Sequence, residues 1–135
     1  MTLASTAVGP ISEPVIRPMT RKVIAVIDDN LNILGAMGRL LSAYGYDTEL
    51  YASAAEFLDA AVTSAASCLV IDIQLGESSG FELAKQLSRA GFTIPVIFMS
   101  AHCDNSIKQQ AIELGCVAFL SKPFSAGELI GALTR

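Results

Sequence analysis

Short runs of apolar residues, many of them β-branched, alternate along this chain with longer segments whose apolar residues recur at helical spacing. The runs predict five strands, at 23–27, 46–51, 68–73, 94–99 and 117–120. The intervening segments predict five helices, near 33–44, 53–62, 81–90, 105–114 and 125–133. Because parallel strands need crossover connections, this alternation favours a parallel sheet with helices on both faces.

Local signals support several of these boundaries. The sequences SAAE at 53–56 and SAGE at 125–128 have the spacing of a capping box, so each predicts the start of a helix. Gly127 and Gly131 weaken the last predicted helix, by roughly 1 kcal/mol each relative to alanine. Residues 76–80 are expected to form a loop.

The length and the apolar content fit one domain. The chain has 135 residues, of which 52% are hydrophobic, enough to build a core without disulfides. Residues 1–20 differ, because they are rich in Ser, Thr, Pro and Ala, and their prolines at 10, 14 and 18 block a helix. We expect a flexible N-terminal extension at 1–20 and a folded domain at 21–135.

Charge, hydropathy and cysteine usage exclude several classes of protein. Thirteen acidic residues against nine scattered basic ones give a net charge of −4, which argues against direct nucleic-acid binding by this chain. The apolar runs are far shorter than the roughly 20 residues of a membrane span. Cys68, Cys103 and Cys116 have no metal or redox spacing, and no secretory signal is evident, so we expect reduced thiols in a cytoplasmic protein.

Polar residues stand at the carboxyl ends of four predicted strands. They are Asp28 and Asp29 after the first strand, Asp72 in the third, Ser100 after the fourth and Lys122 after the fifth. The carboxyl ends of parallel strands meet at one edge of the sheet, where ligands bind. Three carboxylates crowded together repel one another, and their oxygen ligands suit Mg²⁺ or Mn²⁺.

This set of groups predicts phosphoryl-transfer chemistry. A divalent cation and an ammonium group neutralise charge on a transferring phosphoryl group, and a carboxylate can act as the nucleophile. A simpler interpretation exists for each residue: Asp28 and Asp29 could cap a helix, Ser100 could belong to a turn, and Lys122 could be a solvated surface residue. Those separate interpretations do not explain why all five residues stand at the same edge.

The motifs, taken together and in order, resemble the receiver domain of bacterial two-component response regulators. They are Asp28-Asp29 after VIAVI, Asp72 in LVIDIQL, Gly80 in SSGFEL, Ser100-Ala101 after IPVIFM, and Lys122-Pro123-Phe124 in AFLSKPF. The resemblance runs from about residue 22 to residue 133. It implies a flavodoxin-like, doubly wound (βα)5 fold with a five-stranded parallel sheet in the order 2-1-3-4-5.

The resemblance also implies roles for the residues of the site. Asp72 would accept a phosphoryl group from a sensor histidine kinase or a phosphotransfer protein. Asp29, Asp72 and the backbone carbonyl of Gln74 would bind Mg²⁺, and Asp28 would act on the ion mainly through water. Such a chain is not an enzyme acting on other molecules, since it catalyses only its own phosphorylation and dephosphorylation.

The same resemblance implies a conformational switch. Lys122, before a cis-proline, would bind a phosphoryl oxygen, Ser100 would move towards the phosphate, and Phe119 would swing inward. The signal would pass through the face formed by the fourth helix, the fifth strand and the fifth helix. Its recipient would be an unknown downstream protein or output domain. Phosphorylation could also lead to a homodimer with a second copy of the chain. Gln74 and His102 would flank the phosphoryl group at the rim of the pocket.

Departures from the family pattern and rival functions complete the expectations. Gly76 stands where the family often has proline, which predicts a looser loop. A hydrolase of the haloacid dehalogenase type needs a D-x-D motif after the first strand, whereas Asp28 and Asp29 are adjacent here. A flavodoxin-like cofactor module needs a phosphate-binding loop at the same place, where the sequence DDNLN would repel phosphate. An excised receiver from a longer transcriptional regulator and a degenerate receiver that only binds proteins remain as alternatives.

Overall fold

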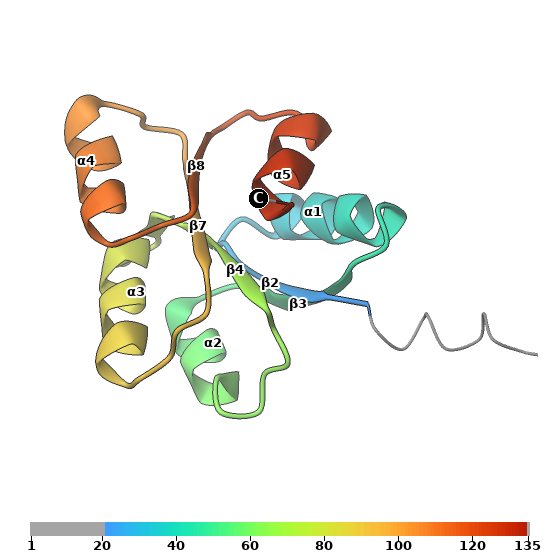
Figure 1. Cartoon of the computed structure of the whole chain (residues 1–135), viewed down its shortest axis with the longest axis horizontal. Coiled ribbons are helices and arrows are strands. Elements are labelled where there is room, and N and C mark those ends of the chain that lie inside the picture. Colours follow the sequence, from blue (N-terminus) through green and yellow to red (C-terminus); the bar gives the residue numbers. More distant parts are fainter. Residues whose placement is uncertain (1–20, 135) are drawn as a thin grey trace, which may run out of the picture.

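A parallel five-stranded sheet forms the centre of the protein, as a computed structural model that describes residues 21–134 shows (Figure 1). The strands are β2 (Val23–Ile27), β3 (Asp47–Tyr51), β4 (Cys68–Asp72), β7 (Val96–Ser100) and β8 (Ala118–Ser121). Their order across the sheet is β3-β2-β4-β7-β8. In chain order this is 2-1-3-4-5, so the predicted doubly wound topology is confirmed. The predicted N-terminal extension lies outside the described residues.

Five helices connect the strands and cover both faces of the sheet. They are α1 (Leu31–Ala43), α2 (Ala54–Ala60), α3 (Gly80–Arg89), α4 (Asn105–Glu113) and α5 (Ala126–Leu133). Helices α1 and α5 pack on one face, whereas α2, α3 and α4 pack on the other (Figure 1). Right-handed crossovers between parallel strands distribute helices in this way.

The core consists of two apolar layers, one on each face of the sheet. Alternate residues of β2 and β4 point into opposite layers: Ala25 and Leu69 face α2 and α3, whereas Val26 and Val70 face α1 and α5. Because these central strands are covered on both faces, almost every side chain in them is apolar and buried. This explains why the sequence shows continuous apolar runs there instead of alternation.

Some predicted boundaries were wrong by two residues. The fourth sheet strand was expected at 94–99, but β7 runs from Val96 to Ser100. It begins only after Pro95 because proline lacks the N–H that a ladder bond needs. The helix expected to reach residue 62 ends at Ala60, and Val62 is 87% exposed. The apolar character of Val62 therefore gave a false helical signal.

The two predicted capping boxes have different outcomes. At α5, the Ser125 hydroxyl oxygen accepts from the backbone N–H of Glu128 at 3.0 Å, and the Glu128 carboxylate accepts from the N–H of Ser125 at 2.9 Å, which confirms the prediction. At α2, Ser53 caps the helix as expected. Glu56, however, accepts from the N–H of Ala52 and not from that of Ser53, so the reciprocal bond is displaced by one residue.

The segment expected to be a loop contains a small antiparallel hairpin. Its strands are β5 (Gln74–Leu75) and β6 (Ser78–Ser79), in which Gln74 pairs with Ser79 and Leu75 with Ser78. Gly76 makes the turn with φ of +64°, a conformation that favours glycine. The segment without the family's proline is therefore a hydrogen-bonded hairpin, which connects β4 directly to α3.

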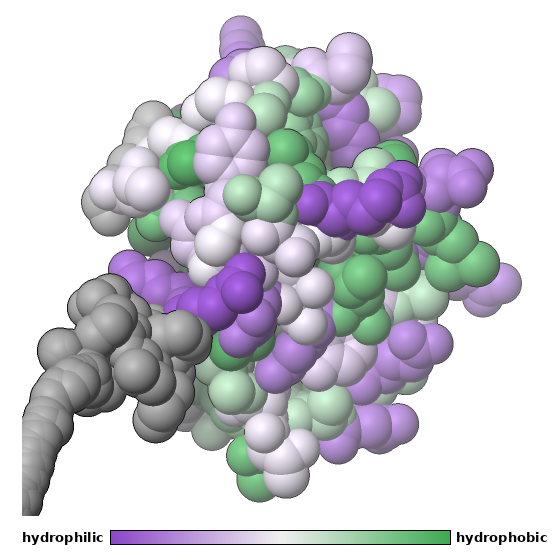
Figure 2. Space-filling model, turned by 90° about the vertical axis from the view of Figure 1, so that its right-hand side faces the viewer, coloured by the Kyte–Doolittle hydropathy of each residue, from purple (hydrophilic) through white to green (hydrophobic). Residues whose placement is uncertain are grey.

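The molecular surface mixes hydrophilic and apolar side chains. On the face shown in Figure 2, hydrophilic residues are scattered among hydrophobic ones. Elsewhere along the chain, Leu31, Ile112 and Val62 are large apolar residues that remain exposed. Within residues 21–134, no helix combines the length and the apolar character required to cross a membrane.

The Gly131→Ala substitution is expected to stabilise the protein. Gly131 lies in α5, and an added Cβ would have no atom within 4 Å, so alanine would reduce the entropy of the unfolded chain without steric cost. We expect a gain of roughly 0.5–1 kcal/mol and a rise in Tm of about 3 °C, measured by thermal unfolding. Gly45→Ala is the matched control: the space is equally open, but φ is +92°, so Tm should fall. Equal effects of the two substitutions would contradict this explanation.

Candidate functional site

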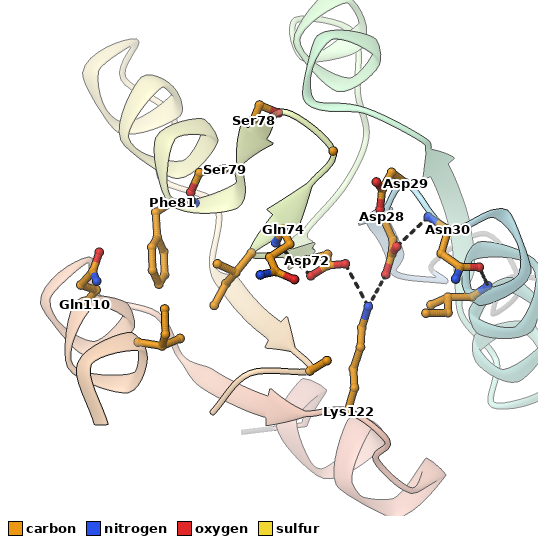
Figure 3. Close-up of a pocket in the computed structure, with 15 residues that line it drawn as sticks. Asp28, Asp29, Asn30, Asp72, Gln74, Ser78, Ser79, Phe81, Gln110 and Lys122 are labelled. Atoms are coloured by element: carbon orange, nitrogen blue, oxygen red, sulfur yellow. Dashed lines mark hydrogen bonds and ion pairs between the residues drawn. The ribbon is translucent and has the colours of Figure 1, made fainter. Parts of the chain in front are cut away.

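The carboxyl edge of the sheet holds a pocket of about 690 Å³. Asp28 and Asp29 follow β2, Asp72 ends β4, and Lys122 follows β8, so four of the predicted residues enter the pocket from three strands. Gln74, in β5, lines the same pocket. Figure 3 shows Lys122 reaching from one side towards Asp72 and Asp28. The convergence expected from the strand ends is present in the structure.

Asp28 lies at the bottom of the site and is fully buried. Its Oδ1 accepts from the backbone N–H of Asn30 at 2.8 Å, and its Oδ2 accepts from Lys122 Nζ at 2.8 Å. Both oxygens therefore have partners within the protein. The cap of α1 is Asn30, whose side chain accepts from the N–H groups of Asn32 and Ile33, so Asp28 is not the helix cap.

Asp72 is held in a similar way on the neighbouring strand. Its Oδ1 accepts from the backbone N–H of Gln74 at 3.1 Å, and its Oδ2 accepts from Lys122 Nζ at 2.9 Å. The Lys122 ammonium group thus bridges the two buried carboxylates (Figure 3). The Lys122–Pro123 peptide bond is cis, as the family resemblance implied.

Burial and charge act on the site in opposite directions. Burial raises the pKa of the Asp72 carboxyl group above its ordinary value, although hydrogen bonds from Lys122 and Gln74 oppose the shift. The Asp28 charge raises the pKa of Asp72 further. Burial alone would lower the pKa of Lys122, but hydrogen bonds to Asp28 and Asp72, together with the negative charges of these two carboxylates, outweigh burial and raise it. Lys122 is therefore a firmly protonated cation beside crowded carboxylates.

The carboxylates have the chemistry of a divalent-cation site. Asp28, Asp29 and Asp72 each offer an oxygen, and the three oxygens lie within 4.8 Å of one another. Asp29 is exposed at the mouth, whereas the other two are buried. One ammonium group does not neutralise three carboxylates, and an all-oxygen donor set suits Mg²⁺ or Mn²⁺. The residues present therefore fit the predicted ion.

The predicted switch residues lie beside the pocket and do not line it. Ser100 is 1% exposed, and its hydroxyl oxygen accepts from the backbone N–H of His102 at 2.9 Å. The backbone N–H of Lys122 donates to the Ser100 carbonyl at 2.8 Å, which joins the ends of β7 and β8. Phe119 is half-buried against the core layer of α2, α3 and α4. His102 is exposed, and only Gln74 of the two rim residues reaches the pocket.

Further residues line the pocket that the sequence did not identify. They include Asn30, Gly76, Ser78, Ser79, Phe81, Ile107 and Gln110. In Figure 3, Phe81 and Gln110 lie at the opposite end of the pocket from Asn30. Asn30 could have been identified from the sequence as a pocket residue, because it directly follows the two aspartates. The residues of α4 had no such signal, because their place at the pocket depends on how that helix lies on the sheet.

Replacing Asp72 with asparagine is expected to stabilise the metal-free protein. Because the pKa of Asp72 is raised, folding favours the neutral form of its carboxyl group. The stability that this group contributes is therefore fully present below about pH 3.9, the pKa of an aspartate in the unfolded chain. It is lost as the pH rises through the higher pKa of the folded protein. With a chelator present, Asp72→Asn should therefore raise Tm at pH 7 and raise it less at pH 4. Addition of Mg²⁺ should stabilise the wild type more than the variant. A Tm difference that does not change with pH would contradict this account.

Comparison with known proteins matches both the fold and the motifs. The family model of the response regulator receiver domain matches residues 24–134. The chain is 39% identical over 111 residues to the response regulator protein TodT of Pseudomonas putida, covering 82% of this chain and 49% of TodT. It is 36% identical over 110 residues to the transcriptional regulatory protein FixJ of Azorhizobium caulinodans, covering 82% of this chain and 52% of FixJ. The chain thus spans about half the length of these curated relatives.

Solved structures agree with this assignment. The receiver domain of the Francisella response regulator 1452 superposes with a TM-score of 0.79 at 28% identity, covering 84% of this chain and 94% of that one. A CheY-like receiver domain from Methanospirillum hungatei JF-1 has the same fold, with a TM-score of 0.79 at 23% identity over 85% of this chain and 92% of that one. With its strand order, its acidic pocket and its lysine all in place, the chain belongs to the receiver domain family of bacterial two-component response regulators.

Proposed function

We propose that this chain is a phosphorylation-driven signalling switch in which Asp72 accepts a phosphoryl group in a Mg²⁺-dependent reaction. The observation that carries the proposal is the Lys122 ammonium group, shared between Asp72 and Asp28 in a pocket of three carboxylates. A nucleophile, a fixed cation and a divalent-cation site are the parts that phosphoryl transfer requires. The phosphoryl donor is a sensor histidine kinase or a phosphotransfer protein.

The chemistry follows from the positions of the side chains. A carboxylate oxygen of Asp72 attacks the phosphorus of a phosphohistidine, the O–P bond forms, the P–N bond breaks, and the imidazole leaves with the bonding electrons. Lys122 Nζ stays beside the phosphoryl oxygens and balances their charge. Asp29, Asp72 and the Gln74 carbonyl would hold Mg²⁺, with Asp28 acting mainly through water, and the ion would supply further charge neutralisation. The backbone N–H of Gln74 keeps the Asp72 carboxylate oriented.

Phosphorylation would then act on residues next to the pocket. It adds a charge of about −1.5 to −2 and strong acceptor oxygens. Ser100 would turn its hydroxyl group from the His102 N–H towards those oxygens, and half-buried Phe119 would move inward behind it. The face formed by α4, β8 and α5 would change shape in response.

The curated relatives indicate the kind of output that the switch would control. FixJ is named a transcriptional regulatory protein, and TodT a response regulator protein, and each is about twice as long as the matching region. We propose that the receiver acts in the cytoplasm on an output domain or a separate protein, and that phosphorylation can also promote a homodimer. The acidic charge and scattered basic residues give no support to direct nucleic-acid binding by residues 21–134.

Asp72 is expected to carry the phosphoryl group. After incubation of the full chain with acetyl phosphate and Mg²⁺, intact-mass spectrometry should detect one phosphoryl adduct, because the pocket itself supplies the catalytic groups. Asp72→Ala and removal of Mg²⁺ should each abolish the adduct. Asp59→Asn, which changes an exposed carboxylate in α2 away from the pocket, is the matched control and should leave the adduct unchanged.

Two outcomes of this experiment would overturn the proposal. An unmodified wild type would favour a degenerate receiver that only binds proteins. An undiminished adduct on Asp72→Ala would place the acceptor elsewhere.

The lifetime of the phosphoryl group is expected to depend on Gln74 more than on His102. The Gln74 side chain lines the pocket beside Asp72 (Figure 3), where it would take up space that an attacking water needs. His102 is exposed and does not line the pocket. Gln74→Ala leaves the backbone carbonyl in place and should shorten the lifetime severalfold. His102→Ala should change it less. Dephosphorylation followed by mass spectrometry gives both values, and equal lifetimes for both variants and the wild type would refute this role of Gln74.

A further inference from the structure

The main chain of the phosphoacceptor lies in direct contact with the first residue of α3. Gly80 begins this helix and is buried. Its backbone N–H donates to the carbonyl of Ile73, the residue after Asp72, at 2.7 Å. The start of α3 and the end of β4 are therefore joined at the acceptor itself.

Only glycine fits at this contact. A Cβ built on Gly80 would overlap the carbonyl oxygen of Asp72 and would lie 3.0 Å from the carbonyl carbon of Asp72 and 2.8 Å from Ile71 Cγ2. Among the glycines of residues 21–134, no other would bring a Cβ within 3.0 Å of another atom. The neighbour here is backbone, which cannot rotate away as a flexible side chain can.

The hairpin between Asp72 and Gly80 leaves little room to absorb a displacement. Gln74 pairs with Ser79, so the two arms of β5 and β6 are linked next to both residues. The same Gln74 donates its N–H to Asp72 Oδ1. A shift of Gly80 away from Asp72, or of Asp72 away from Gly80, must therefore change the position of the carboxylate relative to Lys122.

We propose that Gly80 is a positioning residue for phosphoryl transfer, a role that rests on the proposed function of Asp72. Its missing side chain lets α3 begin against the Asp72 carbonyl and holds the acceptor carboxylate at the distances that Lys122 and the divalent cation require. Gly80 contacts neither the phosphoryl group nor the ion. It acts through the backbone of Asp72.

The test compares four proteins: wild type, Gly80→Ala, Gly131→Ala and the double variant. Gly131→Ala adds a methyl group in α5 without any contact and outside the pocket, so it serves as the matched glycine control and as a stabilised background. The initial rate of phosphorylation by acetyl phosphate is measured against Mg²⁺ concentration and expressed per folded molecule. Thermal unfolding gives the folded fraction.

The expected result is a specific loss of reactivity. Gly80→Ala should lower the rate at least tenfold and raise the Mg²⁺ concentration for half-maximal rate, because small displacements of a reacting group have large kinetic effects. Gly131→Ala should match the wild type. The double variant should have a higher Tm than Gly80→Ala but the same low rate and the same altered Mg²⁺ dependence.

Each other outcome has a distinct meaning. A wild type that takes up no phosphoryl group would refute the proposed function itself. Phosphorylation of the wild type together with an unchanged rate and Mg²⁺ dependence in Gly80→Ala would refute only the role of Gly80. Recovery of the rate in the double variant, or failure of that variant to fold, would show that Gly80 serves the stability of the fold and not the position of Asp72.

Discussion

The site depends on one cation, the ammonium group of Lys122, which lies 2.8 Å from Asp28 and 2.9 Å from Asp72. Two carboxylates buried at adjacent strand ends would repel each other without it. Removing Lys122 would leave both buried carboxylates without a compensating charge, which is strongly unfavourable. Lys122 therefore permits the close approach of the two carboxylates.

The sheet provides the framework that makes this arrangement possible. Strands β2 and β4 pair in parallel, so Asp28 and Asp72 emerge at the same edge, and β8 delivers Lys122 from further along it. Apolar layers on both faces keep these strands rigid. The charged side chains lie at this edge because the rest of each central strand is buried between the apolar layers.

Much of this could be predicted from the sequence, because the alternating pattern and the strand-end residues report on local geometry. The convergence of Asp28, Asp72 and Lys122 needed only the rule that parallel strands share an edge. The shared lysine bond was not foreseen, because it depends on strand order and on the direction of one long side chain. The hairpin at 74–79 was missed because strands of two residues are too short to show a periodic pattern.

Other features depend on tertiary packing and left no local signal. Gln110 lines the pocket because α4 lies on the same face of the sheet as α3, and the Glu56 carboxylate bonds to the N–H one residue before the expected one. Gly80 did stand out in the sequence as part of a motif. Its contact with the Asp72 carbonyl became visible only when the helix was placed against the strand.

Phe119 lies in β8 and Lys122 directly follows this strand, so the two belong to one short segment of chain. One side chain of this segment lies in the pocket and the other lies half-buried at its flank. In the proposed switch, the position of Phe119 and the occupancy of the pocket are coupled. Thermodynamic linkage then requires that, if a ligand in the pocket changes the affinity for a partner at Phe119, the partner changes the affinity of the pocket for that ligand by the same factor. A downstream protein of the proposed switch would therefore change ligand binding in the pocket as well as respond to it.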